Sequence, residues 1–193
     1  MQGDWQAALG VTGRVPHLYW VSMKGEAKRD YPASIGHQSA WYKEYSFVED
    51  HYARINTLMT RGTADVRIGV IHPIESFWVY YGPNDLTSNI KTEINKRFFE
   101  VTNWLLFDCL DFDYICESLL PEQYNESDNG FTVGKMKYDV VIVPACYTLR
   151  SSTLNALKKF KAKGGKVIFM GDAPIMIDAQ FNDEGKNFAK ICD

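Results

Sequence analysis

The chain has 193 residues, a length that suits one domain, or one domain with part of another. Hydrophobic residues make up 46% and charged residues 23% of it, which excludes disorder as the main state. A net charge of −3 without a long basic run predicts no nucleic-acid partner. The sequence shows no apolar run of membrane-spanning length and no signal peptide, so we expect a soluble, cytoplasmic protein with no membrane partner.

The cysteines give no sign of a metal site. Cys109, Cys116, Cys146 and Cys192 are scattered, without a CxxC pair or the Cys/His spacing of zinc ligands. We therefore expect free thiols in a reducing compartment, with no metal and no cofactor. The aromatic share of 14% is high for a nucleotide-fold domain and calls for a separate explanation.

The N-terminal part is predicted to hold one strand and one long helix. Residues 16–23 resemble a strand, and apolar residues recur at helical spacing between Trp41 and Met59. One strand and one helix cannot bury their own apolar faces, so we expect residues 1–62 to be the end of a preceding domain. The sheet predicted for the remainder also has few strands, which suggests that both ends of the chain are cut.

Residues 63–193 begin with a strand, a helix and a second strand. The apolar, β-branched run at 66–71 predicts a buried strand that ends at His72-Pro73. Apolar residues from Ile90 to Leu105 follow in steps of three and four, which predicts a helix capped by Asp85 or Thr87. Residues 112–116 read as the next strand.

A second strand and helix alternation follows. Residues 140–143 predict a strand stopped by Pro144, and residues 167–170 predict another. Between them, a helix starting at Ser151 or Ser152 is predicted to end at Gly164-Gly165. Apolar strands that alternate with amphipathic helices predict an α/β fold, in which a three-layer, doubly wound and mostly parallel sheet is covered on both faces.

Three segments carry a resemblance to a known family. They are VRIGVIHPIESFW at 66–78, YDVVIVPACYTL at 138–149 and LKKFKAKGGKVIF at 157–169. Together they resemble the domain that follows the catalytic barrel of large glycoside hydrolases, with the β-galactosidase trimerisation domain as the named relative. The resemblance covers roughly residues 64 to 180, and α-L-rhamnosidases have a similar layout.

The resemblance implies a flavodoxin-like, class I glutamine-amidotransferase-like fold. It implies that residues 1–62 are the last strand and helix of a (β/α)8 barrel, and that the chain is a non-catalytic structural or assembly domain. The implied partners are the missing catalytic barrel of the parent chain, further copies of the chain in a trimer, and the parent enzyme's carbohydrate substrate.

Ligands of open parallel sheets bind beyond the carboxyl ends of the strands, where this sequence places His72, Glu75, Glu117, Cys146, Tyr147 and Asp172. In the amidotransferase-like family the reactive cysteine follows the next strand, which here is Met170-Gly171-Asp172. Since no thiol stands there, we expect no catalytic residue and a buried Cys146. Glu75 can bind a sugar hydroxyl or cap a loop, and we favour the cap.

The aromatic segment 77–81 and the barrel remnant supply the remaining candidates. Trp78 and Tyr80 can stack on a sugar or seal an interface, and we favour the interface. Substrate contacts from the barrel remnant are expected from His17, Tyr19, Ser22 and Arg29, because barrel active sites lie at the carboxyl ends of the strands.

Two alternatives stay open. The chain could be a stand-alone amidotransferase-like enzyme that uses Cys146 with His72 or Glu75, or a small-molecule-binding, flavodoxin-like module that takes a flavin.

Overall fold

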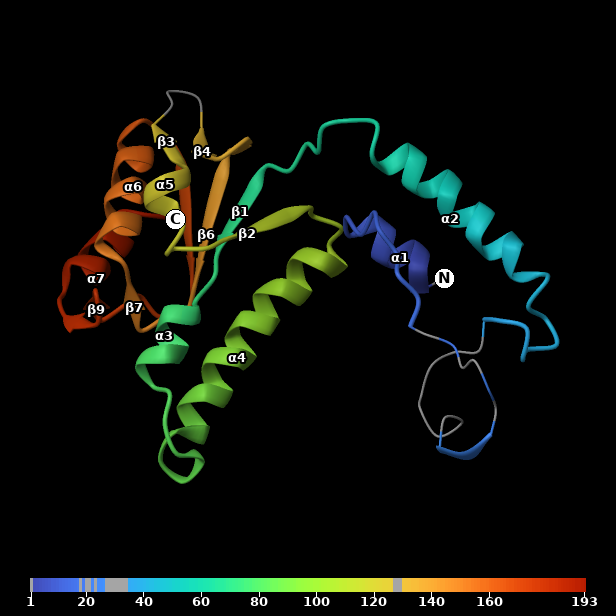
Figure 1. Cartoon of the computed structure of the whole chain (residues 1–193). Coiled ribbons are helices and arrows are strands. Elements are labelled where there is room, and N and C mark those ends of the chain that lie inside the picture. The colour runs from blue at the N-terminus through green and yellow to red at the C-terminus, as the bar shows by residue number, and fades with distance from the viewer. Residues whose placement is uncertain (1, 18, 20–21, 23, 27–34, 127–129) are drawn as a thin grey trace. The chain divides into compact units, whose positions relative to one another are not determined.

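A computed structural model describes residues 2–17, 19, 22, 24–26, 35–126 and 130–193. The chain divides into two compact units, unit 1 from Met1 to Ala64 and unit 2 from Asp65 to Asp193 (Figure 1). Unit 1 is small and helical, whereas unit 2 contains the parallel sheet.

Unit 1 is built on two helices, α1 (Gln2–Ala8) and α2 (Tyr45–Met59). They meet where the Tyr52 ring of α2 packs over Gly3 of α1, a place where no Cβ would fit. The His51 Nε2 atom lies 2.5 Å from Asp4 Oδ1 beside this contact. The helix predicted between Trp41 and Met59 is thus confirmed from Tyr45 onward.

The strand predicted at residues 16–23 is not formed at its described residues, Pro16, His17, Tyr19 and Ser22. The prediction was wrong there because a strand needs a neighbour to accept and donate its backbone hydrogen bonds, and the two helices of unit 1 supply none. Arg29 and the other residues of this segment lie outside the described part of the chain.

Unit 2 contains the four parallel strands that the sequence predicts. They are β1 (Ile68–Ile71), β2 (Phe112–Ile115), β6 (Val140–Pro144) and β8 (Lys166–Met170). The order across the sheet is β2-β1-β6-β8, and every neighbouring pair is parallel. The α/β class is therefore confirmed.

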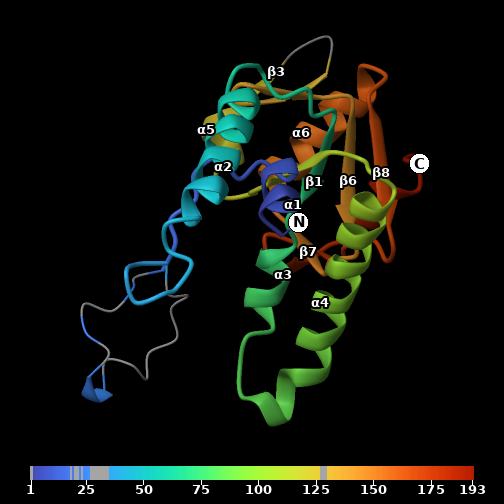
Figure 2. The same ribbon diagram turned by 90° about the vertical axis from the view of Figure 1, so that its right-hand side faces the viewer.

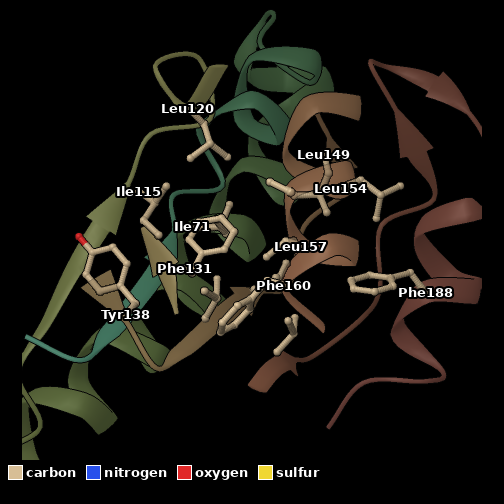
Figure 3. Close-up of a cluster of buried hydrophobic side chains, with 14 of the residues drawn as sticks. Ile71, Ile115, Leu120, Phe131, Tyr138, Leu149, Leu154, Leu157, Phe160 and Phe188 are labelled. Carbon is tan, nitrogen blue, oxygen red and sulfur yellow. The ribbon is translucent and has the colours of Figure 1, made fainter. Parts of the chain in front are cut away.

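Helices cover both faces of this sheet. Successive strand residues point to opposite faces, so Val70 packs with Val101 of α4 (Asn84–Phe107). Its neighbour Ile71 belongs to the other cluster, together with Leu157 of α6 (Ser151–Ala162). Figure 1 shows α4 and α6 on opposite sides of the strands. Figure 3 shows the second cluster, which includes Ile71, Leu157 and Phe160 and which we call the α6 core cluster.

Several short elements were not predicted. One antiparallel sheet consists of β3 (Tyr124–Glu126), β4 (Phe131–Val133) and β5 (Met136–Tyr138), and a second small sheet consists of β7 (Thr148–Leu149), β9 (Met176–Ile177) and β10 (Gln180–Phe181). The short helices are α3 (Ile74–Val79), α5 (Leu120–Gln123) and α7 (Glu184–Ala189). Elements of two to six residues are too short to show a period in the sequence.

Both predicted helix caps differ from the structure. Helix α4 begins at Asn84, and the Thr87 hydroxyl donates to the carbonyl oxygens of Gly82 and Pro83 instead of accepting from an amide. At α6 the N-cap residue is Arg150 rather than Ser151 or Ser152, and the amide of Ser151 donates to Asp178 Oδ1 at 2.9 Å. A residue distant in sequence therefore provides the cap.

Candidate functional site

The carboxyl end of the parallel sheet gathers polar residues from several connections. Glu75 lies on α3 after β1, Glu117 follows β2, Cys146 follows β6 and Asp172 follows β8. The structure divides them into two groups. Glu75 and Glu117 meet at the start of α6, whereas Cys146 and Asp172 line a cavity beside α4.

Arg150 joins the first group. Its guanidinium Nε donates to Glu75 Oε1 at 2.8 Å, and its backbone amide donates to Glu117 Oε2 at 2.8 Å. Glu75 thus pairs with the side chain of the residue that precedes α6, whereas its predicted role as the cap of a loop stays a prediction. Sequence reasoning missed Arg150, because it lies 75 positions from Glu75 and no local pattern connects the two.

Glu117 is a carboxyl group inside the protein. It is 1% exposed, and its Oε1 atom has no hydrogen-bond partner in the described structure. Burial raises its pKa from 4.5 to about 7, against the effect of the Arg150 amide, which lowers it. The neighbouring Glu75 carboxylate also raises the pKa of Glu117. The group therefore changes its charge near neutral pH.

The start of α6 is an unfavourable place for a phosphate. A helix N-terminus binds anions through its free amides, but here Glu117 and Asp178 already accept from the amides of Arg150 and Ser151. A phosphate would meet carboxylates rather than donors. This geometry gives no support to a flavin phosphate at α6.

Cys146 does not have the surroundings of a nucleophile. Its side chain is 7% exposed and belongs to the α6 core cluster, and burial raises the pKa of its thiol far above the ordinary range. Among the described residues, neither His72 nor Glu75 hydrogen-bonds to it; Glu75 bonds to Arg150 instead. A neutral thiol without a base is a small apolar side chain.

His72 lies in an aromatic cluster. Its ring meets Phe98 at a centroid distance of 5.0 Å and Tyr114 at 6.0 Å, both edge to face. Burial lowers the pKa of His72, so the ring is neutral at physiological pH. Its contacts stabilise the packing of α4 against the sheet.

The second group surrounds a cavity of about 390 Å³. Its lining comes from the connections after β6 and β8 and from α4 and α7. The residues that carry charge or reactivity there are Glu93, Arg97, Cys146, Tyr147, Asp172 and Lys186. The sequence indicated Cys146, Tyr147 and Asp172, but nothing in it pointed to Glu93, Arg97 or Lys186.

The predicted aromatic candidates lie on α3 and just after it. The Trp78 side chain is exposed, while the Tyr80 ring packs edge to face on Tyr147 at 4.8 Å. Tyr80 therefore supports one wall residue of the cavity. The turn from α3 to α4 projects away from the sheet in both views (Figures 1 and 2).

The barrel-remnant candidates make local contacts within unit 1. The Tyr19 ring packs edge to face on His37 at 6.3 Å, and Ser22 Oγ accepts from the amide of Lys24. His17 is exposed. Arg29 lies outside the described residues.

Within the described residues, no group of three or more His, Cys, Asp or Glu side chains could hold a metal ion. None of the described helices combines the length and the apolar character needed to cross a membrane. Comparison of the chain with family models, curated proteins and solved structures gave no match.

Proposed function

We propose that unit 2 is a non-catalytic assembly domain of a larger carbohydrate-active enzyme, and that it joins copies of the chain through α4. The observation that carries this proposal is the solvent side of α4, where Phe99, Trp104 and Phe107 are all exposed. We call these three residues the α4 face. Apolar residues gathered on one side of a surface helix mark an interaction site.

A second copy of the chain is the partner that the α4 face fits best. Lys96 and Glu100 lie one turn apart on the same side of the helix, so the face carries both charges. Two copies can therefore meet with opposite charges adjacent and the aromatic rings buried between them. Burying a ring as exposed as Phe107, at 84%, contributes roughly 2 kcal/mol.

The fold offers further support for the family resemblance. The parallel strands have the order second, first, third, fourth, as in the first four strands of flavodoxin-like sheets. The parent enzyme suggested by the resemblance is a glycoside hydrolase of the β-galactosidase or rhamnosidase type. The described residues of unit 1 lack the expected strand and add no support for a barrel remnant, so the proposal rests on unit 2.

Sedimentation velocity of the full chain tests the assembly role. We expect a species that is a multiple of the 22.1 kDa chain mass, and three copies if the resemblance extends to trimers. Phe107→Asp should weaken self-association at least about tenfold, because a buried interface residue of this size contributes more than about 1.4 kcal/mol. The matched control is Phe181→Asp, since Phe181 in β10 is equally exposed at 83%.

A wild-type chain that stays monomeric at high concentration would refute the assembly role. Equal weakening by Phe107→Asp and Phe181→Asp would show that the α4 face is not the contact. The non-catalytic part of the proposal is tested with nitrophenyl glycosides. We expect no hydrolysis by the full chain, because Glu75 and Glu117, the carboxyl pair at the strand ends, both bind Arg150.

A further inference from the structure

The cavity beside α4 has the size and position of a ligand site. Its volume of about 390 Å³ lies within the range of small-molecule pockets. It also lies beyond the carboxyl ends of β6 and β8, the end of a parallel sheet at which ligands bind. No described side chain fills it, and the assembly role assigns nothing to it.

The base of the cavity is apolar. Ile94 and Cys146 are 4% and 7% exposed, and Ile175 and Ala173 continue this surface. A ligand that reaches the base must therefore place an apolar group there, because an unpaired polar group would lose its hydrogen bonds to water.

The close approach of two loops shapes this base. Gly171 has a φ of +113°, and a Cβ at this position would lie 2.8 Å from the Ala145 Cβ atom. Only glycine allows the connection after β8 to pass so near the connection after β6. The two loops consequently hold Cys146 and Asp172 on one cavity.

Charges of both signs surround the apolar base. Glu93 and Arg97 form an ion pair on α4, with 2.6 Å between Oε1 and Nε. Asp172 makes no hydrogen bond or ion pair with another described residue, although it attracts Arg97 at longer range. Lys186 on α7 reaches Asp183 only at 3.5 Å, and such an exposed pair is weak.

This balance of charge selects among ligand classes. The two acidic and two basic side chains of the lining cancel, so a phosphate ester or another multiply charged anion gains no net attraction. A ligand with one ammonium and one carboxylate group gains from both signs. Its ammonium can pair with Asp172, and its carboxylate can pair with Lys186.

We propose that this cavity binds a small zwitterion with an apolar side chain, of the class of free aliphatic or aromatic amino acids. The apolar side chain lies over Ile94, Cys146 and Ile175, and the charged groups lie at the rim. This site uses none of the residues of the α4 face, so ligand binding can be tested independently of self-association.

Amide chemical shifts of the full chain measure the binding directly. L-leucine and L-phenylalanine are titrated, and the amides of Ala145, Cys146 and Ala173 are followed. We expect saturable shifts with a Kd in the millimolar range or below. N-acetyl-leucine lacks the ammonium group and leucinamide lacks the carboxylate, so each should bind at least about tenfold more weakly, the effect of losing roughly 1.4 kcal/mol. Glucose, which has neither charge, should cause no shift at these amides.

Substitutions locate the ligand. Asp172→Asn should weaken leucine binding about tenfold, and Lys186→Met should do the same. The matched control is Asp139→Asn, an exposed carboxylate at the amino end of β6, which should leave the Kd unchanged. Ala173→Leu places a larger side chain in the cavity and should abolish the shifts, while far-UV circular dichroism shows that the variant is folded.

Three results would overturn the proposal. The first is the absence of shifts with both amino acids. The second is equal binding of leucine and its two blocked analogues, which would show that the charges are not recognised. The third is an unchanged Kd in Asp172→Asn, which would place the ligand elsewhere.

Discussion

Glu117 should make the stability of unit 2 depend on pH. Its carboxyl group is almost fully buried and has a pKa of about 7 in the folded chain, against an ordinary value of 4.5. Folding therefore favours the protonated form. The contribution of this group to stability is fully present below pH 4.5 and is lost as the pH rises through about 7.

The magnitude follows from the same two values. Each pKa unit corresponds to about 1.4 kcal/mol, so ionised Glu117 destabilises the folded state by roughly 3 kcal/mol relative to the protonated group. Glu117→Gln keeps an oxygen to accept from the Arg150 amide and removes the charge. We expect the variant to match the wild type near pH 4 and to exceed its free energy of unfolding by up to about 3 kcal/mol at pH 8.

Urea unfolding followed by far-UV circular dichroism between pH 4 and 9 measures this difference. The control is Glu122→Gln, because Glu122 on α5 is exposed and its substitution removes no buried carboxyl group. Taking differences between variant and wild type cancels the titration of all other groups. A difference between Glu117→Gln and wild type that stays constant over this range would refute the buried, proton-binding carboxyl.

Three further predictions concern packing and capping. Cys116 is exposed, so it should react with a thiol reagent at once, whereas Cys146 should react only after unfolding; fast labelling of both would contradict the burial of Cys146. Gly69→Ala should lower the free energy of unfolding by about 1–3 kcal/mol, because the added Cβ would lie 2.5 Å from Ile115 Cδ1. Urea unfolding measures this loss, and an unchanged midpoint would show that the Ile115 side chain moves aside without cost. Asp178→Gly keeps the positive φ of 50° but loses the cap of α6, and should cost about 1 kcal/mol, whereas Asp178→Asn should cost less; equal losses would argue against a capping role.

The strands show how far the sequence alone could reach. Strands β1, β6 and β8 are mainly apolar and rich in Val and Ile, and such a run is visible without knowledge of its neighbours; β2, with the sequence FDYI, shows the pattern only weakly. The predicted helices likewise show their buried positions through spacing, as Leu154, Leu157 and Phe160 do in α6. The strand at residues 16–23 failed because its pattern depends on a partner strand that the described part of unit 1 does not provide.

The site could be predicted only in part. Strand ends are identifiable, so Glu75, Cys146 and Asp172 were placed correctly at the carboxyl end of the sheet. Their partners were not identifiable. Arg97 comes from the exposed side of α4, and its approach to the Asp172 loop depends on how that helix lies against the sheet.

Local periodicity thus determined the α/β class and the main strands and helices of unit 2, because the burial of a strand or of one helix face requires apolar residues at a regular spacing within a short stretch of sequence. The tertiary structure decided which distant residues meet. Asp178 caps α6 across 27 positions, and Arg150 joins Glu117 and Glu75 across 33 and 75. These contacts have no repeat in the sequence, since they arise from the packing of strands and helices, and the contacts of Arg150 hold the buried acid in place.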